Sequence, residues 1–538
     1  MISRRVALAV ALALPSLTGG RVAFGQPWHP DLGDGRYKNP VLFADYSDPD
    51  VVRVGDDYYM TASSFDAVPG LPILHSKDLV NWRIVGHALP RLPDDFDRPQ
   101  HGNGVWAPAI RHHAGEFHIY WGDPDRGIYV VKARSARGPW SDPILVHAAK
   151  GWIDPAPFWD EDGAAYLVHA YARSRSGIKH RLDVARMSPD GMRLLDAGVR
   201  VFEDSVRHPT IEGPKLYKRG GWYYVFAPAG GVPTGWQTVL RSRSPFGPYE
   251  DRIVLAQGHT PVNGPHQGAW VTTPDGREDW FLHFQDVGPY GRVVHLQPMR
   301  WRADGWPVIG DDPDGDGTGQ PVPVWRKPNV GGSRRSTVPA TTDELEAPGL
   351  GLQWQWAGNP RPEWWSLTAR RGALRLFAQP APAGGAPLWN MTSLLLQKLP
   401  GPSLVATARV SRLDGGEGTR AGLVMMGLDY AALAVRRTRL GRELVLATVA
   451  DAPSGGPERE TVVPLGGEGT VELRVSVRDD ARCRFAYSLD DGRTFTPIGA
   501  EFQAREGRWI GAKVGLFATR PDSSAAGGYA DFDWFRIQ

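Results

Sequence analysis

Cysteine is almost absent from this chain of 538 residues. Cys483 is the only one, which excludes an intrachain disulfide framework and a zinc site built from cysteines. Net charge is equally small, because 61 lysines and arginines face 59 aspartates and glutamates, leaving +2. Without a basic surplus, the composition gives no general attraction to nucleic acid or to an anionic membrane. We therefore expect neither as a partner.

Long hydrophobic runs are also missing. The run Val6–Leu14 has nine residues and no later one is longer, whereas a membrane-spanning helix needs about 20. It follows a basic start at residues 1–5 and precedes Ala23-Phe24-Gly25, a pattern that signal peptidase cleaves. We expect residues 1–25 to be a signal peptide and the mature protein to be periplasmic or extracellular in a bacterium. The pair Arg4-Arg5 leaves the Sec and twin-arginine routes open.

Turn-forming and aromatic residues, by contrast, are abundant. The chain has 64 glycines, 47 prolines and 21 tryptophans, which suits short strands and turns better than long helices. Hydrophobic residues make up 41%, enough for full-sized cores. The length predicts more than one domain.

A hairpin pattern of strand, turn and aromatic-rich strand occurs five times. Its copies are VVRVGDDYYMTAS, AIRHHAGEFHIYW, APFWDEDGAAYLV, KLYKRGGWYYVFA and WVTTPDGREDWFLHF. A second turn element follows each copy, beginning at Ser76, Ser135, Ser188, Ser244 and Ala303. Two hairpins per repeat make a four-stranded sheet, so residues 36–310 are predicted to form a five-bladed β-propeller. A large sandwich would not explain a fivefold period.

The repeat register also indicates a site. Five residues stand nine positions before the first four hairpin tips and ten before the fifth, namely Asp48, Trp106, Asp154, Glu212 and His266. Equivalent positions in a propeller are related by rotation, so these side chains should converge at one end of the central channel. A single Asp-Pro is usually only a turn. Three clustered carboxylates repel one another and lose hydration, so a function explains the set better than a structural role.

Acids beside an aromatic wall match the chemistry of glycoside hydrolysis. One carboxyl group protonates the leaving oxygen while another activates water or attacks. Aromatic faces suit the apolar face of a sugar ring. A calcium site is the competing use of the same acids, but calcium takes six to eight oxygen ligands and Trp106 supplies none.

At these residues the sequence resembles glycoside hydrolase family 43. The segments that carry the resemblance are NPVLFADYSDPDVVRVGDDYYMTASSF, WIDPAPFWDEDGAAYLV, TIEGPKLYKRGGWYYVF and GRVVHLQPMRW, in the family's order. The resemblance implies that Asp48 is the general base, Glu212 the general acid, and Asp154 the residue that tunes the acid and orients the substrate. It also implies inversion at the anomeric carbon, with the base and acid about 6.5 to 9.5 Å apart.

The same resemblance implies substrate contacts at Phe65, Trp106, His266 and Arg292. No cofactor is required in this family. In some members the corresponding histidine lies beside a calcium ion on the propeller axis, so a structural calcium stays an open alternative here. Blade 5 reads GPHQGAW, whereas many relatives have glycines and small residues around the histidine.

The period stops after Gly310. Residues 311–348 are rich in Gly, Pro, Asp and Ser and are predicted to be a linker. Within them Asp312-Pro-Asp314-Gly-Asp316-Gly317 imitates an EF-hand loop, but the twelfth position is Pro323, which favours a simple Asp-Gly turn.

Alternating strands fill residues 349–538, such as TVELRVSV and ADFDWFRI, and predict a β-sandwich. This part resembles the concanavalin-like C-terminal domain of family 43 β-xylosidases, through GLQWQWAGNP and YADFDWFRI. Such a domain either only stabilises the propeller or lends a loop to its pocket. Residues 488–495 fit a sialidase Asp-box, but one copy outside the propeller is typical of a hairpin cap.

The expected function is therefore an exo-acting, inverting glycosidase. Its substrate would be a plant cell wall oligosaccharide such as a xylo-oligosaccharide, from which it releases a terminal pentose, with β-D-xylose favoured. The alternatives are an α-L-arabinofuranosidase and a carbohydrate-binding propeller without turnover. A binding protein would need neither Asp48 nor Glu212, so the presence of all three acids favours an enzyme. The sequence leaves the oligomeric state open.

Overall fold

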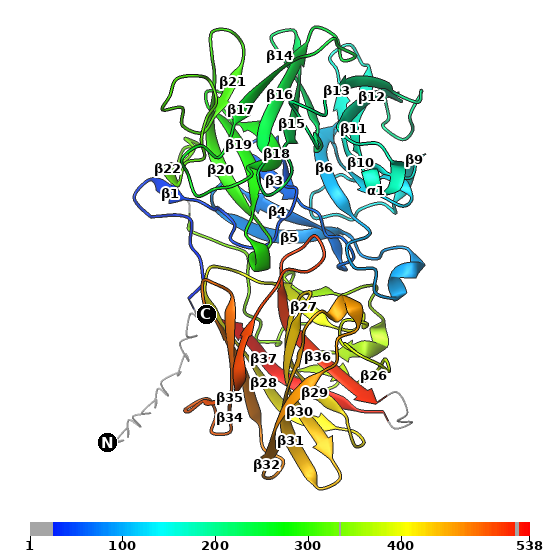
Figure 1. Cartoon of the computed structure of the whole chain (residues 1–538), viewed down its shortest axis with the longest axis vertical. Helices are drawn as coiled ribbons and strands as arrows, with labels where there is room; N and C mark the ends of the chain where they lie inside the picture. Colours follow the sequence, from blue (N-terminus) through cyan, green and yellow to red (C-terminus); the bar gives the residue numbers. More distant parts are fainter. Residues whose placement is uncertain (1–24, 333–334, 522–526) are drawn as a thin grey trace, which may run out of the picture.

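The structure, a computed structural model, describes residues 25–332, 335–521 and 527–538. The predicted signal peptide lies almost wholly outside these residues. Two β-rich bodies follow one another along the chain, as Figure 1 shows, with the propeller in blue to green and the sandwich in yellow to red. The expected five-bladed propeller and C-terminal β-sandwich are confirmed.

Each blade is a four-stranded antiparallel sheet whose strands follow one another in chain order. Blade 1 contains β2 (Asp50–Val54), β3 (Asp57–Thr61), β4 (Gly70–Ser76) and β5 (Trp82–Leu89). Blade 2 contains β6 (Trp106–His113), β7 (Glu116–Asp123), β8 (Gly127–Ala133) and β9 (Ile144–Ala148). Blade 3 contains β10 (Trp152–Trp159), β11 (Ala165–Tyr171), β12 (Arg181–Met187) and β13 (Val199–Glu203).

Blade 4 contains β14 (Lys215–Arg219), β15 (Trp222–Ala229), β16 (Trp236–Ser242) and β17 (Glu250–Leu255). Blade 5 contains β18 (His266–Thr272), β19 (Asp279–Asp286), β20 (Arg292–Trp301) and β21 (Pro307–Ile309). Apolar side chains pack between neighbouring blades, as Val51 of blade 1 does with Trp280 of blade 5. Full burial of such a side chain contributes roughly 1.5–3 kcal/mol.

The ring is closed by the segment that precedes blade 1. The backbone N–H groups of Val41 and Leu42 donate to the carbonyl of Val294 in β20, at 2.8 and 3.2 Å. Nearby, β1 (Arg36–Lys38) pairs with β22 (Val324–Arg326). Blade 5 has all four of its strands without a contribution from the N-terminal segment. This segment therefore closes the ring by hydrogen bonds to β20 and not by adding a strand.

The C-terminal body consists of two packed sheets. One contains β23 (Gln355–Trp356), β26 (Gln379–Ala381), β27 (Leu395–Lys398), β29 (Arg420–Met426), β30 (Tyr430–Thr438), β31 (Gly441–Val449), β32 (Arg459–Leu465) and β36 (Lys513–Pro521). The other contains β24 (Trp365–Ser366), β25 (Leu374–Phe377), β28 (Leu404–Asp414), β33 (Val471–Val477), β34 (Arg482–Ser488), β35 (Thr496–Gln503) and β37 (Tyr529–Ile537). Alternating apolar residues of both sheets, such as Leu433 and Leu473, form one core.

Helices are few and short in the part of the chain that the structure describes. They are α1 (Arg173–Ser176) and the 3-10 turns η1 (Asp94–Asp97), η2 (Gly288–Tyr290), η3 (Pro362–Trp364) and η4 (Ala452–Ser454). None of these described helices is long and apolar enough to cross a lipid bilayer.

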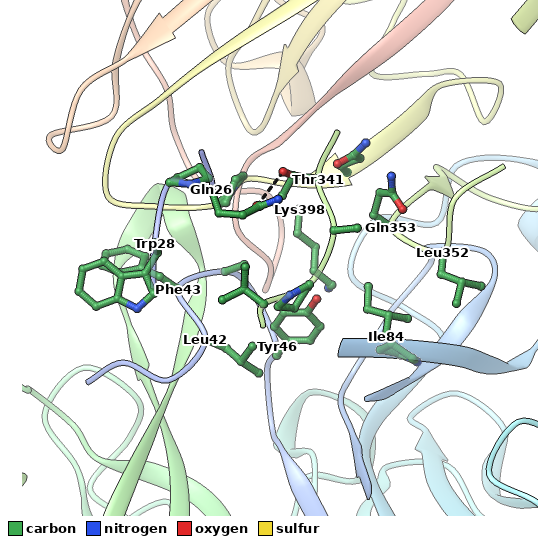
Figure 2. A pocket seen from close by; sticks show the side chains of 18 of the residues that line it. Gln26, Trp28, Leu42, Phe43, Tyr46, Ile84, Thr341, Leu352, Gln353 and Lys398 are labelled. Carbon is green, nitrogen blue, oxygen red and sulfur yellow. Dashed lines mark hydrogen bonds between the residues drawn. The ribbon is translucent and has the colours of Figure 1, made fainter. Parts of the chain in front are cut away.

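Hydrogen bonds join the two bodies. Val68 of the propeller exchanges two backbone hydrogen bonds with Trp356, at 3.0 and 2.6 Å. The Asn359 amide donates to the carbonyls of Leu92 and Pro93 and accepts from the Leu92 N–H. An apolar cavity of about 60 Å³ also lies between the two bodies. Figure 2 shows residues that line it, among them Thr341, which donates to the Gln26 side chain. The sandwich is therefore docked firmly onto the propeller.

Two motifs of the sequence prove to be turns. Asp312 accepts hydrogen bonds from the Gly317 N–H and from Arg300, each at 3.2 Å, and Asp316 accepts from the Thr318 N–H. In the Asp-box, Asp490 accepts from Ser488 and from the backbone and hydroxyl of Thr494. It thus caps the turn between β34 and β35, as expected from a single copy.

Candidate active site

One cavity of about 160 Å³ collects residues from all five blades and from the sandwich. Its lining residues are Asp48, Phe65, Trp106, Ala107, Ile153, Asp154, Glu212, Val232, Gln267, Arg292 and Trp509. Six of the seven predicted site residues therefore lie on its wall. The seventh, His266, lies behind the wall.

The backbone shows how the innermost strands aim these side chains. Each blade has one residue with positive φ where its innermost strand begins; these are Asp48 (55°), Ala107 (38°), Asp154 (56°), Gly213 (57°) and Gln267 (37°). Left-handed backbone is costly for residues other than glycine and is kept mainly at functional sites. This kink turns the chain at the rim of the cavity.

This register corrects the count from hairpin tips. Asp48 and Asp154 hold the kinked position itself, whereas Trp106, Glu212 and His266 stand one residue before it. The strand pairing agrees, because Trp106, Ile153 and His266 form the last ladder pair before the irregularity in their blades. The turns differ in length from blade to blade, so the tip is not a fixed reference point.

Asp48 is surrounded by donors. It is 6% exposed, and its Oδ2 accepts hydrogen bonds from the hydroxyls of Ser47 at 2.7 Å and Ser63 at 2.5 Å. The guanidinium of Arg292 lies 3.4 and 3.5 Å from its two oxygens. These contacts fix the carboxylate in one orientation and leave Oδ1 facing the guanidinium and the cavity.

Asp154 is the most deeply buried acid of the cavity, at 4% exposure. Its Oδ2 accepts a hydrogen bond of 2.7 Å from the Gly213 N–H. Gly213 is needed here, because a Cβ at that position would lie 2.7 Å from the Gln267 side chain. Burial, together with the charges of Glu212 and Asp48, raises the pKa of Asp154 well above its usual range.

Glu212 is the more accessible acid, with 30% of its side chain exposed. Its Oε1 lies 2.9 Å from His266 Nε2. His266 is 1% exposed and is held by blade 5 behind Glu212. The structure thus places His266 as a hydrogen-bond partner of an acid, whereas the sequence predicted a contact with the substrate.

Aromatic rings form the rest of the wall. Trp106 donates from Nε1 to the Gly102 carbonyl at 2.9 Å, and its ring meets those of Phe65 and Trp509 edge-on, each at 6.4 Å between centroids. Arg175 of α1 lies 5.9 Å over the same indole. Such flat apolar faces pack well against the C–H face of a sugar.

Trp509 is the residue that the sequence did not identify. It belongs to the loop between β35 and β36 of the sandwich, has a φ of 66° and is 52% exposed. It also separates this cavity from a larger one of about 470 Å³, which shares Val232, Arg292 and Trp509 with it. The sandwich therefore lends a loop to the propeller's pocket, one of the two alternatives left open by the sequence.

Two known protein families match the two domains of the chain. A family described as glycosyl hydrolases family 43 matches residues 37–307. A second, described as the β-xylosidase C-terminal concanavalin A-like domain, matches residues 342–538.

Individual relatives are similar over nearly the whole chain. A β-xylosidase homologue of Xylanibacter ruminicola is 42% identical over 494 residues, which cover 91% of this chain and 87% of the relative. A β-xylosidase of Formosa agariphila is 35% identical, over 94% and 90%. A non-reducing-end α-L-arabinofuranosidase of Bacteroides ovatus is 29% identical, over 94% and 95%. Among solved structures, a xylan β-1,4-xylosidase from Bacillus halodurans superimposes with a TM-score of 0.81 at 26% identity, covering 93% of this chain and 99% of that one.

Proposed function

Because the chain belongs to glycosyl hydrolase family 43 and is a glycosidase, we propose that it releases a terminal β-D-xylose from xylo-oligosaccharides with inversion of configuration. The observation that carries the proposal is the cavity itself, where Asp48 and Glu212 share one wall with three aromatic rings. The two relatives that are 42% and 35% identical over nearly the whole chain are of the β-xylosidase type.

We assign the role of general base to Asp48. A base must present an ionised oxygen to a water molecule. The serine hydroxyls hold Oδ2 of Asp48, and Arg292 lies beside both oxygens, so the carboxylate is oriented before the substrate binds. It can then take a proton from water as the water attacks the anomeric carbon.

We assign the role of general acid to Glu212. Its carboxyl group is the most exposed of the three, as a group that must reach the leaving oxygen requires. The neighbouring Asp154 has a raised pKa because of burial and of the charges of Glu212 and Asp48. We assign Asp154 the role of tuning the acid and orienting the substrate, and its own orientation is fixed by the Gly213 N–H.

The small size of the cavity supports action on chain ends. Its volume is about 160 Å³, and Trp509 of the sandwich lines it together with the five blades. A small pocket accepts the end of an oligosaccharide more readily than its middle.

An α-L-arabinofuranosidase is the second candidate. It is favoured by the relative of Bacteroides ovatus, whose similarity also extends over both domains. A comparison of two aryl glycosides separates the candidates. Purified protein should hydrolyse the aryl β-D-xyloside at least about tenfold faster, by kcat/KM, than the aryl α-L-arabinofuranoside. The reverse ratio would assign the arabinofuranosidase. Turnover of neither substrate would reject both.

We also propose that the protein is exported by means of residues 1–25. The support is the basic, apolar and small-residue order of this segment. N-terminal sequencing of the protein from a periplasmic or culture fraction should begin at Gln26. An intact Met1 in the cytoplasmic fraction alone would contradict export.

A further inference from the structure

A second ring of residues lies directly beyond the kinked positions of the innermost strands. Two residues after each kink stand Asp50, Ala109, Ala156, Lys215 and Ala269, and each of them is 0% exposed. Residues two apart in a strand point to the same side, so this ring faces the propeller axis one step below the acids. Three of the five ring residues are alanines, and Lys215 has the longest side chain of the ring.

The end of the Lys215 side chain has no partner in this ring. Its Nζ is fully buried and makes no hydrogen bond to any of the described residues. Asp50, the acid of the same ring, is bound through one oxygen only: its Oδ2 accepts from the Ile110 N–H at 2.7 Å and from Arg111 at 2.6 Å, while its Oδ1 is buried and accepts no hydrogen bond from the described residues. A buried ammonium without a partner is costly and calls for a reason.

The charged groups that act on Lys215 come from three other blades. They are Asp48 and Asp50 of blade 1, Arg111 of blade 2 and Asp154 of blade 3. Blade 5 has the uncharged Ala269 at the same ring position. Three acids thus face two cations in a region closed to solvent, where charges interact more strongly than in water.

The structural calcium considered from the sequence stays a prediction. Calcium takes six to eight oxygens, and the described residues contain no group of three or more His, Cys, Asp or Glu that could hold a metal ion. His266 Nε2 is engaged by Glu212.

We propose that Lys215 is a positioning residue, whose buried ammonium is the internal cation that stabilises negative charge on Asp48 and Asp154 from below. It does so without contacting the sugar. The proposal rests on the glycosidase function described above. The proposal explains why the longest side chain of the ring is basic and why its amine lacks a hydrogen-bond partner. The positive charge of the amine acts on the acids one step above without a direct hydrogen bond.

The electrostatic balance supports this role. Burial and repulsion by Arg111 lower the pKa of Lys215, while Asp50, Asp154 and Asp48 act in the opposite direction. Conversely, Lys215 opposes the rise in the pKa of Asp154 that burial, Glu212 and Asp48 cause. Removing the ammonium should therefore raise the pKa values of the acids above it.

The first test is the pH dependence of kcat/KM in Lys215→Met, which keeps a chain of similar length and removes the charge. The acidic limb should move to higher pH by about one unit, with a fall in kcat larger than any rise in KM. Asp50→Asn should move the same limb to lower pH, because one competing acid is removed. Lys398→Met is the matched control: this lysine is also largely buried, beside Tyr46 at the seam, and its loss should leave the limb in place.

Unmoved limbs in both Lys215→Met and Asp50→Asn would overturn the proposal, because a space-filling lysine would change the height of the profile and not its position. If Lys215→Met does not fold, the direction of the shift in Asp50→Asn decides alone. A shift to higher pH in that variant would contradict the proposal.

A second test needs no activity. The free energy of unfolding of wild type and Lys215→Met is measured in urea between pH 4.5 and 7.5. The carboxylates stabilised by Lys215 are charged only above their pKa, so the penalty of the substitution should grow as pH rises. A difference independent of pH would reject the role of Lys215. If the wild type hydrolyses neither aryl glycoside, the proposed function fails, while this measurement still decides about Lys215.

Discussion

The propeller and the sandwich contribute to the same pocket in different ways. In the propeller, five copies of one hairpin bring their kinked ends to one axis, so that Asp48, Asp154 and Glu212 meet from blades 1, 3 and 4. In the sandwich, a single loop carries Trp509 over the same cavity. The repeated blades therefore supply the reacting groups. The sandwich supplies one wall residue, whose position depends on how the two domains dock.

The largest effect is expected from the two acids of the propeller. Asp48→Asn and Glu212→Gln should each lower kcat on a xylo-oligosaccharide by about 10²–10⁴-fold, the range attributed to general acid and base groups. Steady-state kinetics of both variants measure this. Thermal unfolding near the wild-type temperature serves as the control for folding. A folded variant with near wild-type turnover would remove that residue from the mechanism.

Glu212 allows a sharper experiment. An aryl substrate with an acidic phenol needs little protonation as it leaves, so Glu212→Gln should lose much less rate on it than on xylobiose. Asp48→Asn should lower the hydrolysis rate of both substrates by the same factor, because each reaction needs an activated water. Equal losses for Glu212→Gln on the two substrates would count against its role as the acid.

Asp154 should affect both rate and stability. Its pKa is raised in the folded state by burial, Glu212 and Asp48, so between its ordinary and its folded pKa the unfolded chain loses a proton that the folded chain keeps. Folding stability therefore falls as pH rises through that window. Asp154→Asn removes this penalty, and its free energy of unfolding should exceed that of the wild type by at least about 1 kcal/mol more at pH 8 than at pH 4.5.

Urea unfolding at the two pH values measures the difference. In the same variant, the alkaline limb of the pH profile of kcat/KM should move to lower pH. Glu212→Gln, whose side chain is more exposed, serves as the comparison for stability. A constant stability difference at both pH values would show that Asp154 is not an uncompensated buried acid.

Much of this site could be predicted from the sequence, because the propeller repeats itself. The hairpin period identified the blades, and Asp48, Trp106, Asp154 and Glu212 followed from one register. The position of His266 behind Glu212 could not be predicted from this register, because Trp106 and Glu212 stand at the same place relative to the kink and yet line the cavity. Two residues inward of Glu212 the sequence register gives Pro214, so Lys215 follows only from the kinked position that the structure shows.

Trp509 could not be predicted in the same way. Its loop belongs to no repeat, and an exposed tryptophan between two strands is by itself unremarkable as a sequence signal. Its place depends on the docking of two separately folded bodies through contacts such as Val68 with Trp356, which leave no periodic trace. The substrate roles of Phe65, Arg292 and Trp106 stay predictions, although all three line the cavity.

A substitution in the sandwich's loop should have an effect of intermediate size on the kinetics. Trp509→Ala removes an aromatic wall worth roughly 1 kcal/mol, so KM for xylo-oligosaccharides should rise about fivefold while kcat changes less. Leu440→Ala is the matched control, because Leu440 is fully exposed on the same domain and lies outside the cavity lining. An unchanged KM in Trp509→Ala would show that the propeller alone binds the substrate.

The smallest effect on activity should come from a substitution at the seam between the propeller and the sandwich. The Tyr290 hydroxyl is shared by the carbonyls of Pro402 and Arg478 across the two bodies. Tyr290→Phe removes this hydroxyl and should lower the free energy of unfolding by about 1 kcal/mol, with kinetic constants close to those of the wild type. Differential scanning calorimetry and kinetics on the same preparation measure both. A large loss of activity would mean that docking controls the acids as well as the wall.

The central claim is that Asp48 and Glu212 act on opposite sides of one bond, so that water displaces the leaving group directly. Proton NMR of the first sugar released from a β-xyloside tests it most directly, because the α and β anomers give separate signals before they interconvert. The account predicts that α-xylose appears first and that β-xylose accumulates only as the anomers equilibrate. Initial release of β-xylose would require a covalent intermediate on one carboxylate and would contradict the roles assigned to both acids.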